Sequence, residues 1–199
     1  MNRLGDQEQI SNKRDHSQST FVAEDLPQLI ADCIAQNRSS QKKLYEKYAP
    51  VIYGIIRRYI FSQSTAQEIL NDTFYKVFTR LSQYSFSGSF EGWMRRIAVN
   101  TITDYLRKNI KHEQVVQIDN VSIEPWVPTD IIGKINYKDL LQTIHTLPDT
   151  QKTVFNLFVF EDMSHKEIGE LLGLTENNCR WYLNDARKRL KEKIKALTP

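Results

Sequence analysis

Side chains suited to binding nucleic-acid bases gather near the C-terminus of this 199-residue chain. They fall within about two turns of one expected helix: Asn177, Asn178, Arg180, Trp181 and Asn184. Asparagine and arginine can form paired hydrogen bonds with base edges in the major groove of DNA. Lys188 lies in the basic run that follows, residues 187–193, and could contact phosphates. The pattern predicts a helix that binds duplex DNA, although a basic run alone is also typical of a solvated helix end.

A second polar and basic face is expected on a helix over about residues 90–108. Its members follow one another at spacings of four, three and four residues, opposite an apolar stripe: Arg96, Asn100, Thr103 and Arg107. Tyr84 and Phe86 precede this helix in a segment rich in serine and glycine. Aromatic rings beside basic side chains are groups that stack on unpaired bases. This face and loop therefore predict a surface for single-stranded nucleic acid, while Trp93 is expected in the core.

The sequence contains no pattern of residues typical of an enzyme active site or a metal site. The histidines are scattered, and Cys33 and Cys179 stand 146 positions apart. Such spacing fits neither a metal site nor a disulfide framework. There is no glycine-rich phosphate loop and no nucleophile with an evident base. We therefore expect no enzyme, no cofactor and no metal, with Cys179 as a small core residue.

The distribution of charge points to nucleic acid more clearly than the total does. The formal net charge is +3, but residues 51–111 carry nine basic and four acidic side chains. Residues 112–135 carry one basic and four acidic side chains, and residues 180–195 carry seven and two. Two basic blocks separated by an acidic stretch are typical of a chain that contacts nucleic acid at two places.

Helices are the elements that must position these residues. Seven glycines and six prolines leave few turn signals for a β-rich fold, and apolar residues recur at helical spacing. We expect an all-α protein with two small helical domains, residues 21–111 and 136–199, joined by a flexible acidic linker at 112–135. Residues 1–20 are expected to form a disordered tail. Ser64, with Gln67 three residues on, is expected to cap the third helix.

The chain is expected to be cytoplasmic. No apolar run approaches the ~20 residues that a membrane-spanning helix needs. The polar start of the chain also lacks the apolar core of a signal peptide.

The segment from Ser164 to Thr175 predicts a helix-turn-helix. Ser164 and Glu167 form a capping box at the start of a short helix, and Gly173 suits the left-handed residue that ends it. Gly169 is expected where a second helix crosses, and its missing side chain would permit a close approach. Thr175 can cap the next helix. This geometry would lay the second helix in the major groove. A plain helical hairpin inside a bundle is the alternative.

Together these segments resemble the compact two-domain sigma factors of bacterial RNA polymerase, the extracytoplasmic-function group of the sigma-70 family. AQEILNDTFYKVF at residues 66–78 is similar to the family's polymerase-clamp-binding helix. SFEGWMRRIAVNTITDYLRK at residues 89–108 is similar to its promoter −10 helix. Residues 147–175 and ARKRL at 186–190 are similar to its −35-binding domain. The resemblance covers roughly residues 21–111 and 136–197.

The resemblance implies a role for each surface. The surface that docks on the clamp helices of the polymerase β′ subunit would include Asn71, Asp72 and Phe74. The loop at 82–89, with Tyr84 and Phe86, would capture a flipped −10 base. The melted strand would be guided by the polar face of the following helix: Arg96, Asn100, Thr103 and Arg107. The groove of the −35 duplex would face Arg180, Trp181 and Asn184.

The partners that the resemblance implies are core RNA polymerase, through its β′ clamp helices and β flap, and promoter DNA. It also allows for an anti-sigma factor. The acidic linker would run toward the RNA exit path. No small-molecule substrate and no membrane insertion are expected.

Two positions depart from the family pattern. Asn71-Asp72 stand where the family usually has Gln-Glu, so each side chain is one methylene shorter. Trp181-Tyr182 stand where a small residue and then a basic one are usual, which favours an altered or shape-dependent −35 element.

A stand-alone helix-turn-helix regulator that binds a duplex operator is the alternative interpretation. Such a regulator would bind DNA without polymerase, and it would leave the clamp-like helix unexplained.

Overall fold

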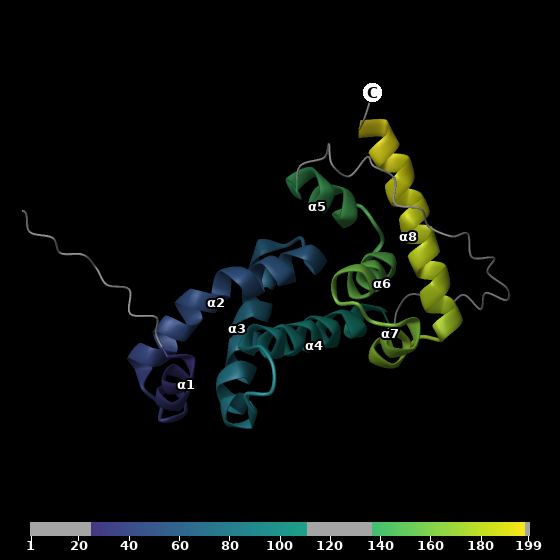
Figure 1. The fold of residues 1–199 in the computed structure, drawn as a ribbon. Helices are drawn as coiled ribbons and strands as arrows, with labels where there is room; N and C mark the ends of the chain where they lie inside the picture. The colour runs from purple at the N-terminus through teal and green to yellow at the C-terminus, as the bar shows by residue number, and fades with distance from the viewer. Residues whose placement is uncertain (1–24, 111–136, 198–199) are drawn as a thin grey trace, which may run out of the picture.

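A computed structural model describes residues 25–110 and 137–197, and these residues form helices without a strand. The first range contains α1 (Leu26–Ile34), α2 (Arg38–Tyr59), α3 (Gln63–Arg80), the short 3-10 helix η1 (Leu81–Gln83) and α4 (Phe90–Ile110). The second contains α5 (Tyr137–His145), α6 (Asp149–Phe160), α7 (His165–Leu172) and α8 (Glu176–Leu197) (Figure 1). The all-α prediction is confirmed for these residues. The expected tail at 1–20 and the expected linker at 112–135 lie outside them.

Helices α2, α3 and α4 pack against one another and bury their apolar stripes. Ile52, Ile56, Val77 and Met94 are fully buried in this core. Helix α1 packs against α2. Burial of aliphatic and aromatic side chains supplies the main favourable free energy for such a bundle.

The cap of α3 lies two residues before the predicted one. The hydroxyl of Ser62 accepts a hydrogen bond from the backbone amide of Thr65 at 3.4 Å, and α3 begins at Gln63. Ser64 therefore lies inside the first turn, where its hydroxyl is 3.0 Å from that of Ser62. The prediction that Ser64 is the cap is wrong, because the alternation of serines and threonine offers more than one capping register.

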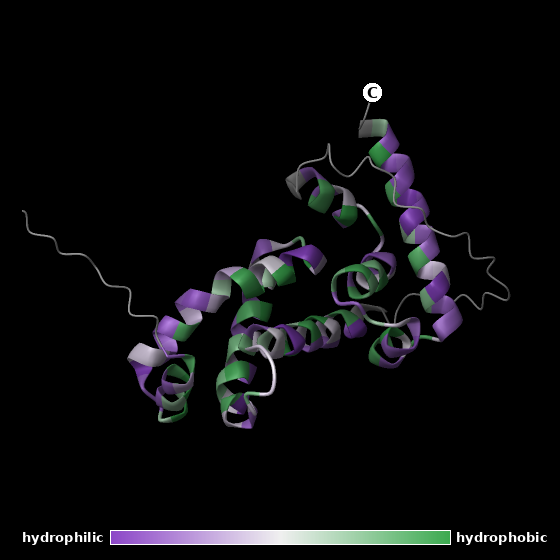
Figure 2. Ribbon diagram, viewed as in Figure 1, coloured by the Kyte–Doolittle hydropathy of each residue, from purple (hydrophilic) through white to green (hydrophobic). Residues whose placement is uncertain are grey.

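Helices α6, α7 and α8 form the second group, with α5 packed against α8. Val154, Leu157, Ile168 and Leu183 are buried between these helices. Helix α8 is largely hydrophilic, with apolar residues at intervals along its length (Figure 2). This pattern is typical of a helix that buries one stripe and leaves the remainder to solvent.

The two groups of helices contact each other. Helix α2 touches α5 and α6, and the C-terminal part of α4 approaches α7 (Figure 1). A single cluster of buried apolar residues extends from α1 through α4 into α6, α7 and α8. The surfaces predicted to bind nucleic acid must therefore be located with both groups in view.

Candidate nucleic-acid interface

The predicted helix-turn-helix is present in α7 and α8. The hydroxyl of Ser164 accepts from the Glu167 amide at 3.3 Å, and the Glu167 carboxylate accepts from the Ser164 amide at 2.8 Å. Gly173 ends α7 in the left-handed region, with φ of 72°. The Asn178 amide donates to the Thr175 hydroxyl at 3.2 Å, which caps α8. The capping box, the glycine stop and the second cap are confirmed as predicted.

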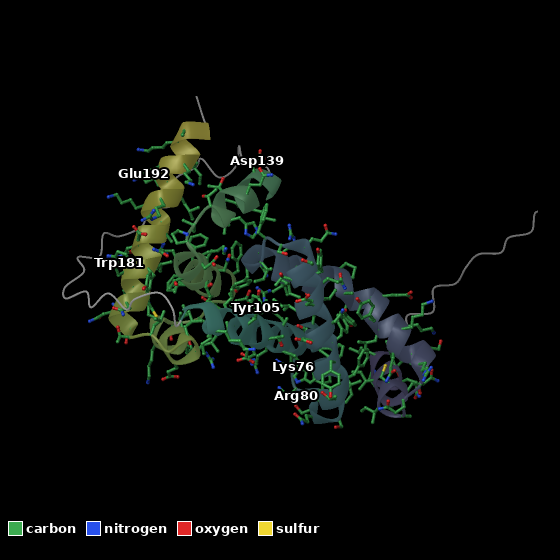
Figure 3. All side chains as sticks on the ribbon, turned by 180° about the vertical axis from the view of Figure 1, so that it is seen from behind. Lys76, Arg80, Tyr105, Asp139, Trp181 and Glu192 are labelled. Atoms are coloured by element: carbon green, nitrogen blue, oxygen red, sulfur yellow. The ribbon has the colours of Figure 1, made fainter. Side chains whose placement is uncertain are left out.

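The predicted base-contacting residues of α8 differ in how accessible they are. Asn177 and Lys188 are exposed, whereas the remaining accessible members are half-buried: Arg180, Trp181 and Asn184. Figure 3 places Trp181 and Glu192 on α8, at the edge of the molecule. The Arg180 guanidinium is hydrogen-bonded to the Glu176 carboxylate within the same helix.

Asn178, which was predicted to face DNA, is buried instead. It lies four residues before Tyr182 and eight before Ala186, and both of these are buried too. Residues four apart share one side of a helix, so Asn178 belongs to the stripe that packs into the protein.

The predicted polar face of α4 also contains both exposed and buried residues. Arg96 and Asn100 are exposed, but Thr103 is fully buried and its hydroxyl bonds the backbone oxygens of Val99 and Asn100, each at 3.0 Å. Thr103 is therefore satisfied within its own helix and does not reach the surface. Arg107 is half-buried, and its Nε and Nη2 donate to the backbone oxygen of Leu171 at 3.1 and 2.5 Å.

In the loop before α4, one of the two predicted aromatic residues is buried and the other is exposed. Tyr84 is buried, and its hydroxyl donates to the Gly88 backbone oxygen at 2.7 Å, which fixes the loop. Its ring lies 5.1 Å from Phe90 and 5.5 Å from Trp93 between centroids. Phe86 is 53% exposed and has a φ of 59°, a left-handed conformation that is uncommon for a bulky residue. Phe86 is thus the aromatic that the loop presents, and Tyr84 is the one that supports it.

The predicted docking surface on α3 contains a residue that the sequence analysis missed. Asn71 and Asp72 are exposed, but Phe74 is only 3% exposed and its ring lies 4.6 Å from that of Tyr45. Phe74 therefore supports this surface from the core. Tyr75 is 71% exposed, and it could have been noticed because it falls outside the apolar stripe of α3.

Comparison with known proteins assigns the chain to a family. The model of sigma-70 region 2 matches residues 44–111, and that of sigma-70, region 4 matches residues 137–190. The RNA polymerase sigma factor YlaC of Bacillus subtilis (strain 168) is 25% identical over 163 residues, which cover 80% of this chain and 94% of YlaC. The chain belongs to the extracytoplasmic-function group of the sigma-70 family.

One further relative and one solved structure were also matched. The ECF RNA polymerase sigma factor SigE of Mycolicibacterium smegmatis is 28% identical over 157 residues, covering 77% of this chain and 61% of SigE. Among solved structures, the sigma factor RpoE in complex with the anti-sigma factor NepR from Bartonella quintana matches at 17% identity. That match covers 79% of this chain and 98% of the solved one, with a TM-score of 0.48.

The two halves of this sigma factor meet at a buried carboxylate that the sequence analysis did not single out. The side chain of Glu161, in the turn after α6, is 7% exposed. Its Oε2 accepts from Arg95 Nε at 2.5 Å, and its Oε1 accepts from Arg58 Nη2 and the Tyr59 hydroxyl, each at 3.5 Å. Burial and the neighbouring Glu161 charge raise the pKa of Tyr59 well above its ordinary value, so its hydroxyl stays protonated and donates.

Burial also shifts the pKa values of Cys179 and of two histidines. It raises the pKa of the Cys179 thiol to about 11, and Cys179 is fully buried, as expected of a core residue. Burial lowers the pKa of His145, and burial together with nearby Arg180 lowers that of His165.

Neither a metal-binding group nor a membrane-spanning helix is found in the part of the chain that the structure describes. No three His, Cys, Asp or Glu side chains there are grouped so that they could hold a metal ion. None of its helices is both long and apolar enough to cross a membrane.

Proposed function

We propose that this sigma factor is a dissociable, non-enzymatic specificity subunit that directs core RNA polymerase to promoters in the cytoplasm. The observation that carries the proposal is the presence of region 2 and region 4 in that order on one chain. Each region offers an accessible polar surface, with Arg96 and Asn100 on α4 and Asn177 and Lys188 on α8.

Region 4 would anchor the protein on the −35 duplex. Helix α8 would enter the major groove, with Asn177, Arg180 and Asn184 near base edges and Lys188 on phosphate. Trp181 can contact a thymine methyl group or the groove wall by its ring, which suits an element that is partly recognised by shape.

Region 2 would hold the melted −10 strand and bind the polymerase. Phe86 would stack on an unpaired base, and Arg96 and Asn100 would follow the backbone of the strand. Asn71 and Asp72 would dock on the β′ clamp helices, and the exposed ring of Tyr75 would add contact area to this surface. The β flap would receive region 4, and an anti-sigma factor would compete for these surfaces.

Promoter-dependent run-off transcription tests the proposal. Purified protein is added to core RNA polymerase on a library of upstream sequences, and transcripts are mapped. We expect discrete start sites that disappear with the N71A/D72A variant and persist with E68A, a change at an exposed position of the same helix. Absence of any transcript, together with tight binding of the protein alone to a duplex operator, would identify a stand-alone regulator instead.

A further inference from the structure

Two acidic side chains lie within the basic segment of α8 that would face DNA. Residues 180–195 carry seven basic and two acidic side chains, and the two acids are Asp185 and Glu192. Glu192 is exposed at the edge of the molecule (Figure 3), whereas the side chain of Asp185 is only 19% exposed. A carboxylate repels phosphates. An acid beside a DNA-contacting face therefore lowers affinity unless it acts through another group.

Asp185 is hydrogen-bonded to two side chains at once. Its Oδ2 accepts from Arg189 Nε, one turn further along α8, at 2.6 Å and from Gln151 Nε2 at 3.2 Å. Gln151 belongs to α6 and is only 7% exposed, so it ties the carboxylate to the core of the second group of helices. The guanidinium of Arg189 is therefore held, through Asp185, by a helix other than its own.

A second acid–arginine pair on α8 shows what the bond to α6 adds. Arg180 is bonded to Glu176 at the same four-residue spacing, but the side chain of Glu176 is 46% exposed. Exposed pairs of this kind contribute little, because both side chains lose conformational freedom when they form. The Gln151 amide already restricts Asp185 in the free protein, so Arg189 has a fixed partner.

Arg189 lies on one flank of the helix face assigned to DNA. Successive residues of an α-helix are about 100° apart, so Arg189 stands between the exposed Lys188 and the buried Leu190. A helix is about 10–12 Å across with its side chains, and the major groove is about 12 Å wide. A flank of a helix in that groove therefore meets the sugar–phosphate wall.

The guanidinium of Arg189 keeps donors for a ligand at that wall. Its side chain is 50% exposed, and its Nη groups form no hydrogen bond to the residues that the structure describes. A guanidinium has five N–H donors in a rigid fork, of which Asp185 engages the one on Nε. The end of the fork that carries both Nη groups stays available, and such a fork binds phosphate through two parallel hydrogen bonds.

We propose that Asp185 is a positioning residue for DNA binding, which orients the Arg189 guanidinium toward a phosphate at the wall of the major groove. Fixing the fork before binding reduces the conformational entropy that is lost on binding. The inference rests on the proposed function for the −35 duplex as the DNA, but a phosphate contact is itself independent of sequence.

Binding to a fluorescent duplex of mixed sequence tests the role of Asp185. Anisotropy titrations use the full-length protein, alone and in holoenzyme, at about 50–200 mM salt. Repulsion alone would make D185A and the matched control E192A both bind DNA more tightly than the wild type. We expect E192A to bind equally or more tightly, and D185A to bind about threefold to tenfold more weakly. An affinity of D185A at or above that of the wild type would overturn the proposal.

A double-mutant cycle with R189Q separates positioning from damage to the fold. R189Q should weaken binding and lower the slope of log K against log salt by about one. In the R189Q background, D185A should cost no further affinity, because no guanidinium remains to be oriented. An equal loss from D185A in both backgrounds would overturn the positioning role, since it would come from α8 itself. Circular dichroism and urea unfolding accompany each variant.

The two proposals fail in different ways. Run-off transcripts, together with a D185A protein that binds DNA as well as the wild type, would leave the sigma-factor function standing and remove the role of Asp185. Weaker DNA binding by D185A, in a protein that supports no transcription with core polymerase, would remove the function and leave the role of Asp185. A wild-type protein that binds no duplex, alone or in holoenzyme, would remove the phosphate contact.

Discussion

At the scale of single residues, Gly169 shows how closely the turn of the helix-turn-helix is packed. A Cβ placed on Gly169 would lie 2.7 Å from the Leu174 backbone oxygen. The Leu174 amide also donates to the Gly169 oxygen at 2.9 Å, so the two backbones are held together. The contact comes from the turn itself, where the sequence analysis expected a crossing helix.

Replacement of Gly169 by alanine should therefore destabilise the protein. Glycine to alanine inside a helix ordinarily stabilises by about 0.5–1 kcal/mol, but the turn here would have to shift, and we expect a net loss of about 1–3 kcal/mol. The control is G54A in α2, where a Cβ meets nothing within 4 Å. Urea unfolding should show G169A less stable than the wild type and G54A equal or more stable. A stabilised G169A would mean that the turn is loosely packed.

His145 should make the stability of the protein depend on pH. Its ring donates to the Arg57 backbone oxygen and lies 5.4 Å from the Phe61 ring, with the charges of Lys152 and Arg57 nearby. Burial lowers its folded-state pKa below the unfolded value of about 6.5, so the unfolded chain binds more protons. The free energy of unfolding should be flat above pH 7.5 and should fall as the pH drops through 6.5 toward the folded pKa.

The variant H145Q should flatten that dependence. H165Q should flatten it further, since the pKa of His165 is lowered too. Unfolding midpoints in urea measured from pH 8 to pH 5.5 give the slope for each variant. An unchanged slope in the double variant would contradict the assignment to these two rings.

Apart from the cap of α3, residue-level predictions succeeded where one helix settles the answer and failed where a neighbouring element does. The caps at Ser164 and Thr175 depend on local backbone amides only, and both are present. Thr103 and Asn178 lie on the flank of an apolar stripe, where the width of the buried face depends on what packs beside it. Periodicity shows where a buried stripe repeats along a helix but not how wide it is. Thr103 and Asn178 were therefore both predicted to be exposed.

At the scale of elements, the proposed function gives α8 two roles along its length. Asn177 is exposed in its first turn and Lys188 in its middle. Leu183, Ala186 and Leu190 form the buried stripe by which the helix packs on the core. A side chain at a base edge and one at a phosphate make different contributions to binding, because only the first carries sequence information.

The first turn and the middle of α8 should therefore respond differently to mutation. K188Q should weaken binding to all duplex sequences alike and reduce the slope of log K against log salt by about one. N177A should leave the salt slope unchanged and reduce discrimination at one position of the −35 element by about 1–3 kcal/mol. Anisotropy titrations of holoenzyme on matched and mismatched promoter duplexes measure both quantities. A sequence-independent loss in N177A would place that residue on phosphate.

At the scale of the whole molecule, the helical content and the helix-turn-helix followed from periodicity and capping signals. The contact between the halves did not. A 3.6-residue period shows that a helix has an apolar face but does not name the partner helix. Glu161 illustrates the gap, since an acidic residue after an apolar run is typical of an exposed turn, yet two arginines more than 60 positions earlier bury it.

Unfolding of the two halves should be coupled through this contact. Trp93 reports on α4 and Trp181 on α8, so W126F/W181F and W93F/W126F each leave one probe. In proteins with Glu161 intact, we expect the two probes to give closely similar urea midpoints, because the shared core and the α2 hydrogen bonds are lost together. In the E161Q background the midpoints should separate, since the less stable half can then unfold first. The E170Q background should keep them together, and midpoints that separate equally in all backgrounds would show that the halves unfold independently of Glu161.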